Sequence, residues 1–364
     1  MKSKTNIITS KQLIFTIIGS TIGVGIFTLT STVVRDAKQD VWISTLMGSL
    51  LPLLGIFMLH LINRKFPDLS FAEYSEKVLS KWPGKMLSLL FVLYTMAFAA
   101  VVARIFVDIL KTYLFPVTPV WALGILILLV SAYLASKDAR VLGRVNELVF
   151  YESLFLFVFI LGAVPKIDIS FFRPVGQAGL TNILMGSYDA VFAFLGLEVL
   201  LVFYSLVQNK KEIVKASLTA VLIITIIYLM VALAVLGIFG PEVTEHIRFG
   251  LMGLLKTYQA PMIERGEFFF IIFWVFVAFR PVANMYFVSR YTMEKIMGVN
   301  SPLLMTVLFL PFLLIVILLP QNFEQALSFS SYLGLVGIAF ITVIPLGLWA
   351  IAMLRGIGGE QGNA

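Results

Sequence analysis

The chain has 364 residues, of which 60% are hydrophobic and only 13% are charged. A soluble domain has roughly 45–50% apolar and about 25% charged residues, so we expect lipid to be the solvent for most of this surface. The absence of cysteine excludes disulfides and thiolate chemistry, and the two histidines, His60 and His246, lie in different segments, which argues against a zinc site. We expect no cofactor and no metal. The net charge of +7 is more typical of the cytoplasmic loops of a membrane protein than of nucleic-acid binding.

Apolar runs of about 20 residues predict an all-α integral membrane protein with about ten transmembrane helices in a single membrane domain, 1–364. The runs lie near 12–34, 41–62, 86–113, 118–135, 147–164, 182–206, 214–239, 267–290, 303–320 and 331–354. If the N-terminus is cytoplasmic, seventeen Lys and Arg residues lie on the cytoplasmic side and eight on the other. This bias predicts that both termini are cytoplasmic, which an even number of spans requires.

Two connectors are longer than a turn. Residues 63–85 place Phe66, Leu69 and Phe71 among charged residues at helical spacing, which predicts a short amphipathic helix at the inner membrane face. Residues 240–266 have a weaker pattern of the same kind and are predicted to lie on the outer side. A plain surface connector is the alternative for both.

The first predicted helix contains the segment Gly19-Ser20-Thr21-Ile22-Gly23-Val24-Gly25. Three glycines within seven residues weaken a helix by roughly 1 kcal/mol each relative to alanine. In lipid, an unwound backbone persists only where it lines a cavity or is buried in protein. Its free N–H groups attract an anion and its free carbonyl groups attract a cation. Close helix packing through small residues is the alternative that needs no ligand.

The sixth predicted helix contains Phe192-Ala193-Phe194-Leu195-Gly196-Leu197-Glu198, which sets a glycine and a carboxylate near mid-membrane. A carboxylate there is costly unless it is neutral, paired or hydrated. Helices one and six are corresponding members of two sets of five, and glycine-interrupted helices at matching positions indicate a ligand site between inverted repeats. We therefore predict repeats over about 12–164 and 182–354, with helices one and six broken.

These two segments carry a family resemblance. Ile22-Gly23-Val24-Gly25-Ile26-Phe27 resembles the first-helix glycine motif of the amino acid–polyamine–organocation transporters, and the segment Phe192–Glu198 resembles their sixth-helix Phe-x-Gly-x-Glu pattern. Many such transporters have twelve spans. Ten spans in 364 residues are similar instead to the spore germination receptor B subunits, and this resemblance covers essentially the whole chain.

The resemblance implies two inverted five-helix repeats with an amino acid bound at the two breaks. The ligand's carboxylate is expected at backbone N–H groups of the first break, and its ammonium at carbonyl groups of both breaks. Phe192 takes the place of a gating aromatic residue, and Glu198 that of a carboxylate linked to proton coupling. The predicted ligand-binding residues are Thr21, Ile22, Gly23, Val24, Gly25, Phe192, Leu195 and Gly196.

Three more ionisable side chains within the predicted spans are candidates for a functional role. Arg104 and Asp108 are four residues apart, so they share a helix face and can pair. A local salt bridge is one interpretation, and part of an outer polar pathway is the other. Arg280 lies at the depth of Glu198, which makes it a candidate partner for that carboxylate, with solvation of Arg280 in a vestibule as the alternative. If Glu198 is unpaired, we expect it to be protonated.

The resemblance implies a germinant-sensing subunit of the spore inner membrane that binds a small amino acid and signals to partner receptor subunits of the A and C type. The alternative is a proton-coupled amino acid transporter. Both would use the same pocket, so its chemistry does not separate them. The sequence contains no Ser-His-Asp set, phosphate loop or metal-ligand cluster, and we do not expect an enzyme.

Overall fold

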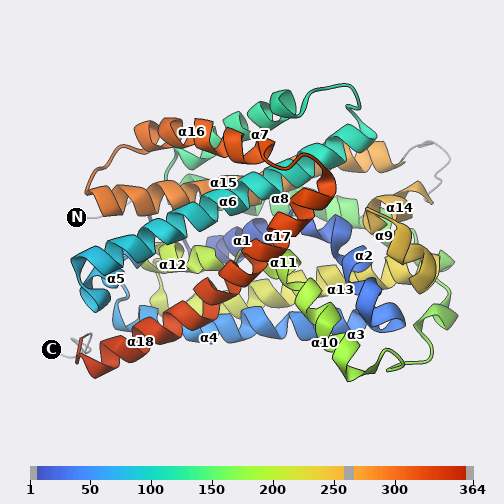
Figure 1. The fold of residues 1–364 in the computed structure, drawn as a ribbon, viewed down its shortest axis with the longest axis horizontal. Helices are drawn as coiled ribbons and strands as arrows, with labels where there is room; N and C mark the ends of the chain where they lie inside the picture. Colours follow the sequence, from blue (N-terminus) through green and yellow to red (C-terminus); the bar gives the residue numbers. More distant parts are fainter. Residues whose placement is uncertain (1–5, 258–265, 358–364) are drawn as a thin grey trace.

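The computed structural model describes residues 6–257 and 266–357, which are almost entirely helical (Figure 1). The first four predicted spans are occupied by α1 (Ser10–Thr21) and α2 (Gly25–Ala37), α3 (Val41–Gly48) and α4 (Leu50–Lys65), α6 (Lys81–Tyr113), and α7 (Val120–Ala135). The next three are occupied by α8 (Ala139–Ser153) and α9 (Phe157–Leu161), α10 (Gly179–Asp189), α11 (Val191–Phe194) and α12 (Leu200–Phe203), and α13 (Ile213–His246). The last three are α15 (Gly266–Met297), α16 (Pro302–Leu318), and α17 (Phe323–Ile338) with α18 (Ile344–Leu354).

The structure confirms a helical membrane protein. Among the described residues, six helical segments are long and apolar enough to cross a membrane, or seven if the bent pair Gly179–Asp189 and Val191–Leu206 is one span. The helices α7 and α16 are apolar but shorter, as expected for those two spans. The division into two inverted repeats stays a prediction.

Some helices extend beyond their apolar runs. The fifth span was predicted to begin at 147, but α8 begins at Ala139. Its first two turns are helical but carry polar residues, so the apolar run did not include them. The seventh was predicted to end at 239, but α13 continues to His246 past a kink where Gly240 has φ 69° and Pro241 follows. Hydropathy marks the part of a helix that lies in lipid, so it underestimates a helix that continues into water.

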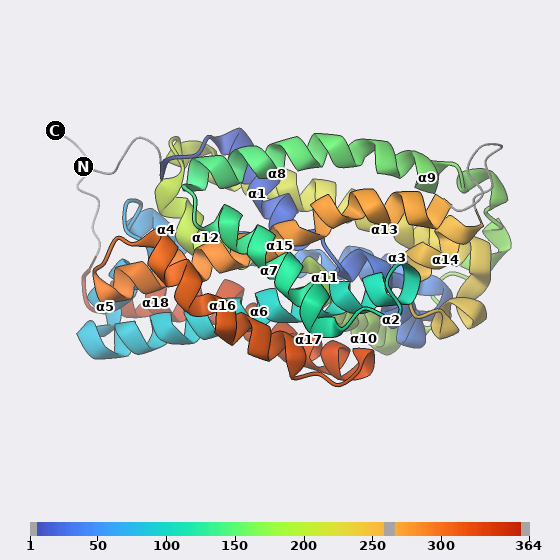
Figure 2. The ribbon, with the colours of Figure 1, turned by 90° about the horizontal axis from the view of Figure 1, so that it is seen from above.

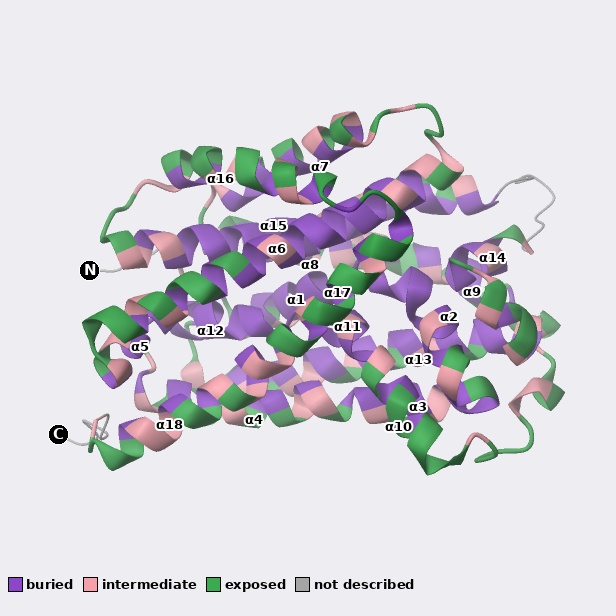
Figure 3. Cartoon of the chain, in the orientation of Figure 1, coloured by how far each residue is buried: buried purple, intermediate pink, exposed green. Residues whose placement is uncertain are grey.

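The helices form layers around a buried centre. Figure 3 shows that α6 and α15 are buried along much of their length, whereas α7 and α16 carry many exposed residues. Seen from above, α8 lies on one side of the bundle, and α16 and α17 lie on the opposite side (Figure 2). Exposed residues on the outer layer are large and apolar, such as Leu126, Leu308 and Ile315, as lipid-facing helices require.

The predicted amphipathic helix exists as α5 (Phe71–Leu79), but its apolar face does not lie in lipid. Phe71, Tyr74 and Val78 are fully buried because α5 packs against α6, α15 and α18. The helix begins with a capping box between Ser70 and Glu73. Burial raises the pKa of Glu73, but hydrogen bonds from Ser70 and Lys295 outweigh it, and the net pKa is below its usual value. Glu73 is therefore an ionised link between α5 and α15.

The second long connector contains α14 (Gly250–Lys256), which packs against α2, α13 and α15. Its leucines at 251, 254 and 255 are buried, as the helical spacing predicted. Residues 258–265 of this connector lie outside the described residues. We call this end of the bundle the α14 end and the opposite end, where α5 and the last turn of α18 lie, the α5 end (Figure 1).

A short strap closes the α5 end. Ile8 forms the one isolated β-bridge of the described residues, with Val207 just after the sixth span. The Ile8 N–H donates to the Leu206 carbonyl at 2.9 Å, and the Gln208 N–H donates to the Ile8 carbonyl at 2.9 Å. The segment before helix one is thereby joined to the segment after helix six.

We expect the strap to contribute measurably to stability. Gln208→Pro removes one strap donor and should lower the free energy of unfolding by about 1 kcal/mol, because a typical internal hydrogen bond contributes about that much. Gln208→Ala is the matched control, since it removes the exposed side chain and keeps the N–H group. Thermal unfolding of the purified protein in detergent measures both. Equal melting temperatures for the two variants would contradict a role for the strap.

Candidate ligand-binding site

Helix one is broken where the glycines predicted it. The helix α1 ends at Thr21 and α2 begins at Gly25, with Ile22 in an extended conformation. Val24 is the N-cap of α2 and no side chain caps it. Because the first N–H groups of a helix have no acceptor within the helix, the first turn of α2 presents free donors. The break therefore leaves backbone N–H groups of the first turn of α2 without a side-chain cap, and their binding of an anion stays a prediction.

Helix six is broken at the second predicted glycine. The helix α11 ends at Phe194, Leu195 is extended, and Gly196 has φ 129°, a conformation that side-chain-bearing residues rarely adopt. A 3-10 turn (Leu197–Val199) then leads into α12. Both breaks expected from the sequence are confirmed.

The two breaks pack directly against each other. A Cβ atom at Gly196 would lie 2.5 Å from Oγ1 of Thr21 and 2.7 Å from the Ser20 carbonyl. A Cβ atom at Gly25 would lie 2.9 Å from Cα of Ala193. All three distances are too short for contacts between real atoms, so Gly25 and Gly196 require glycine. The structure thus shows the close packing that was the alternative reading of the glycines, alongside the unwound backbone.

Buried side chains bind some of the freed carbonyl groups. The Tyr228 hydroxyl of α13 is 2.7 Å from the Ala193 carbonyl and 3.2 Å from that of Thr21, and Trp274 of α15 donates to the Gly23 carbonyl at 3.3 Å. Neither residue was among the predicted site residues, although a Tyr or Trp within an apolar run is expected to be buried and then needs an acceptor for its polar hydrogen.

Glu198 is fully buried and has two hydrogen-bond donors. The Gly196 N–H donates to its carboxylate at 2.6 Å, and the Tyr94 hydroxyl of α6 donates to the other oxygen. The expected pairing with Arg280 is wrong. Arg280 is also buried, but its guanidinium contacts the carbonyl groups of Asn146 and Val277, each at 3.4 Å.

Arg280 belongs to a polar cluster around α1. Asn146 of α8 donates to Asn284 of α15 at 2.9 Å, and Asn284 donates to the Ser20 hydroxyl at 2.9 Å. A Cβ atom at Gly19 would lie 1.9 Å from the Asn146 side-chain oxygen, so α1 and α8 are in close contact. The cluster holds the first half of helix one against α8 and α15.

Arg104 and Asp108 form the expected local salt bridge, at 3.1 Å. Arg104 also donates to the carbonyl groups of Ile317, at 3.3 Å, and Pro320 at the end of α16. A cation at a helix C-terminus is favourable, so this contact ties α6 to α16. A part in a polar pathway stays a prediction.

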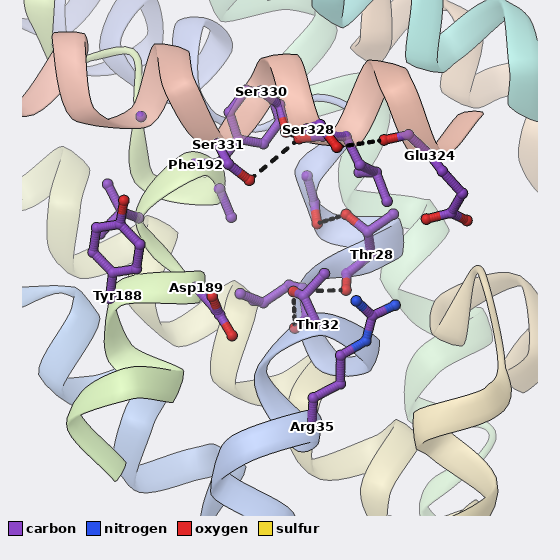
Figure 4. A pocket seen from close by; sticks show the side chains of 16 residues that line it. Thr28, Thr32, Arg35, Tyr188, Asp189, Phe192, Glu324, Ser328, Ser330 and Ser331 are labelled. Atoms are coloured by element: carbon purple, nitrogen blue, oxygen red, sulfur yellow. Dashed lines mark hydrogen bonds between the residues drawn. The ribbon is translucent and has the colours of Figure 1, made fainter. Parts of the chain in front are cut away.

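A cavity of about 210 Å³ leads from the α14 end to the breaks (Figure 4). Gly25 and Phe192, two of the predicted ligand-binding residues, line it together with Ala193. Phe192 packs on Phe98 of α6, with ring centroids 5.9 Å apart. The other predicted residues, Thr21, Ile22, Gly23, Val24, Leu195 and Gly196, are buried around the two breaks.

The contact between Tyr94 and Glu198 depends on a third glycine, Gly337 of α17. A Cβ atom there would lie 2.5 Å from the Tyr94 hydroxyl and 2.9 Å from the Glu198 carboxylate. We expect Gly337→Ala to destabilise the protein by about 1–3 kcal/mol through overpacking. Gly347→Ala in α18 is the control, because a Cβ atom there meets no atom within 4 Å. Its effect should be neutral or stabilising by up to about 1 kcal/mol. Thermal unfolding of both variants measures this, and equal stability would refute the role of Gly337.

Solved structures with the same fold are membrane transporters. The protein is similar to MhsT in complex with L-phenylalanine, with a TM-score of 0.63 at 14% identity over 96% of this chain and 89% of that one. It is also similar to a Na⁺-coupled sialic acid symporter in a substrate-bound outward-open state, with a TM-score of 0.62 at 17% identity over 96% of this chain and 79% of that one. At these identities the likeness establishes the fold alone.

Sequence relatives are spore germination proteins. The protein is 24% identical to the spore germination protein YndE of Bacillus subtilis (strain 168), over 98% of this chain and 99% of that protein. It is 24% identical to the spore germination protein GerQB of Bacillus cereus, over 93% of this chain and 94% of that protein. The spore germination protein family model matches residues 7–326. The chain therefore belongs to the spore germination protein family, with the fold of a membrane transporter.

Proposed function

We propose that this protein is a germinant-sensing membrane subunit. It binds a small amino acid where the cavity meets the two helix breaks, and it passes the resulting movement to partner receptor subunits of the A and C type in the spore inner membrane. Support for the subunit role comes from the family and from relatives of nearly equal length.

The observation that carries the ligand proposal is the uncapped N-terminus of α2 at the floor of the cavity. Gly25 is both the first residue of α2 and a lining residue. A helix N-terminus with free N–H groups and a positive dipole end favours a carboxylate. The nearby carbonyl groups of the breaks suit an ammonium group. The cavity of about 210 Å³, with Phe192 and Ala193 beside Gly25, favours a small or apolar amino acid over a charged one.

Two glycines of the same cavity make a matched test. Gly25→Leu places a side chain against Ala193 at the proposed carboxylate position, whereas Gly334→Ala adds a Cβ atom that meets nothing closer than 4.0 Å. We expect the first variant to lose amino acid binding and the germination response, and its amount in the membrane separates loss of the site from loss of the protein. The second should retain both. The measurements are binding of each standard amino acid to purified protein and the dose–response of spores. A normal dose–response in Gly25→Leu spores would count against this site.

A proton-coupled amino acid transporter is the second candidate, favoured by the buried carboxylate of Glu198 next to the helix-six break. Amino acid uptake into liposomes that contain only this chain separates the two candidates. We expect no uptake, because a sensing subunit acts through its partners. If uptake occurs and Glu198→Gln abolishes its pH dependence, the protein is a transporter and the sensor proposal fails.

A further inference from the structure

We propose that the cavity at the α14 end contains an outer binding site for a zwitterionic amino acid, separate from the helix breaks. In this site Arg35 binds the carboxylate and Asp189 binds the ammonium group. The identity of the ligand rests on the proposed function. The amino acid would bind to this outer site before it reaches Gly25.

The outer site lies where two cavities join. The cavity that reaches Gly25 and a second one of about 260 Å³ share five lining residues. The shared residues are Thr28, Thr32, Arg35, Glu324 and Leu327. The walls of the first cavity come from α2, from the end of α10, from α11 and from α17, so four helices enclose the space (Figure 4).

Charges of both signs face this space. Figure 4 shows Arg35 between Asp189 on one side and Glu324 on the other. Among the described residues, no salt bridge holds Arg35, whereas the neighbouring Lys38 is paired with Glu245 at 2.6 Å. Glu324 is paired with Arg248 at 3.7 Å, and both side chains are more than half exposed, so that contact is weak. The Arg35 guanidinium is therefore available to a ligand.

The wall of the cavity that contains Asp189 suits a cation. Asp189 lines the cavity at the end of α10, on the side of Arg35 away from Glu324 (Figure 4). The wall that α17 contributes carries hydroxyl groups whose hydrogens are used within this helix (Figure 4). Ser328 donates to the Glu324 carbonyl at 3.0 Å and Ser331 to the Leu327 carbonyl at 3.2 Å. Their oxygens remain acceptors for an ammonium group.

One bound amino acid does not occupy both positions. Gly25 and Arg35 are ten residues apart on α2, which corresponds to about 15 Å along the helix axis. A carboxylate held by the Arg35 guanidinium is therefore not the carboxylate held by the N–H groups at Gly25. The exposed outer site should be weak and sensitive to salt, because solvent screens its charges. The buried inner site should be less sensitive.

Equilibrium binding to the purified full chain in lipid nanodiscs tests the outer site. The radiolabelled probe is whichever of the twenty standard amino acids most raises the melting temperature. We expect two bound equivalents, of which Arg35→Gln and Asp189→Asn each weaken the salt-sensitive one by roughly five- to tenfold. Lys256→Gln is the control, since it removes a positive charge at the same end, outside both cavities. Analogues of the probe that lack either the carboxylate or the amino group should not compete.

The outcomes separate this inference from the proposed function. If one equivalent binds, Gly25→Leu abolishes it and the Arg35 and Asp189 variants bind normally, the outer site is refuted and the inner one stands. If Arg35→Gln removes binding that Gly25→Leu leaves intact, the outer site is supported and the inner one is refuted. If none of the twenty amino acids binds, both are refuted. Melting temperatures equal to that of the unchanged protein show that each variant is folded.

Discussion

A backbone that leaves its helix inside a membrane protein must find new hydrogen-bond partners, and this requirement organises the centre of the molecule. Tyr228 and Trp274 bind carbonyl groups freed by the breaks, and Glu198 accepts the N–H group of Gly196. These partners come from α13, α15 and the broken helix itself. The packing of distant helices is therefore what keeps the two breaks open.

The N-terminus of α2 differs from the other freed backbone groups, because no side chain binds it. Carbonyl groups at both breaks accept hydrogen bonds from side chains, but no side chain caps the first turn of α2. That turn begins at Gly25, at the floor of the cavity. Leaving these donors without a protein partner costs stability unless water or a ligand binds them. In the proposed function, the ligand's carboxylate would bind these donors.

The sequence predicted the breaks well because their cause is local. Glycines in an apolar run weaken the helix at that point, whatever surrounds it. The partners of the breaks were missed because they depend on which helices are neighbours, which no single segment encodes. The pairing of Glu198 with Arg280 was wrong for a related reason. Hydropathy gives the depth of a residue in the membrane and says nothing about the direction of its side chain.

Other differences between the predictions and the structure also arise because a segment does not encode which helices are its neighbours. The apolar face of α5 was expected in lipid, but a helical pattern does not say whether lipid or protein covers it, and here α6 covers it. Of the three charged residues that the structure brings to one cavity, Arg35, Asp189 and Glu324, only Arg35 entered the sequence prediction, in the count of Lys and Arg that oriented the chain. The three residues come from three different helices. A binding surface made by the ends of several helices is visible only after the helices are assembled.

The two ends of the bundle differ in what holds them, and this bears on the choice between sensing and transport. Helix one is fixed by the strap at the α5 end, by the Lys11–Glu147 salt bridge at 2.8 Å and, next to its break, by the Asn146–Asn284–Ser20 hydrogen bonds. Each internal hydrogen bond contributes about 1 kcal/mol, so opening this end costs several kcal/mol. A ligand shifts an equilibrium only by its difference in affinity for the two states, typically about 1–3 kcal/mol between coupled sites. In the proposed function, binding of a small amino acid would therefore move α2 and α11, at the α14 end, more readily than it would release α1. Movement at one end is sufficient for a sensor, whereas a transporter must open both.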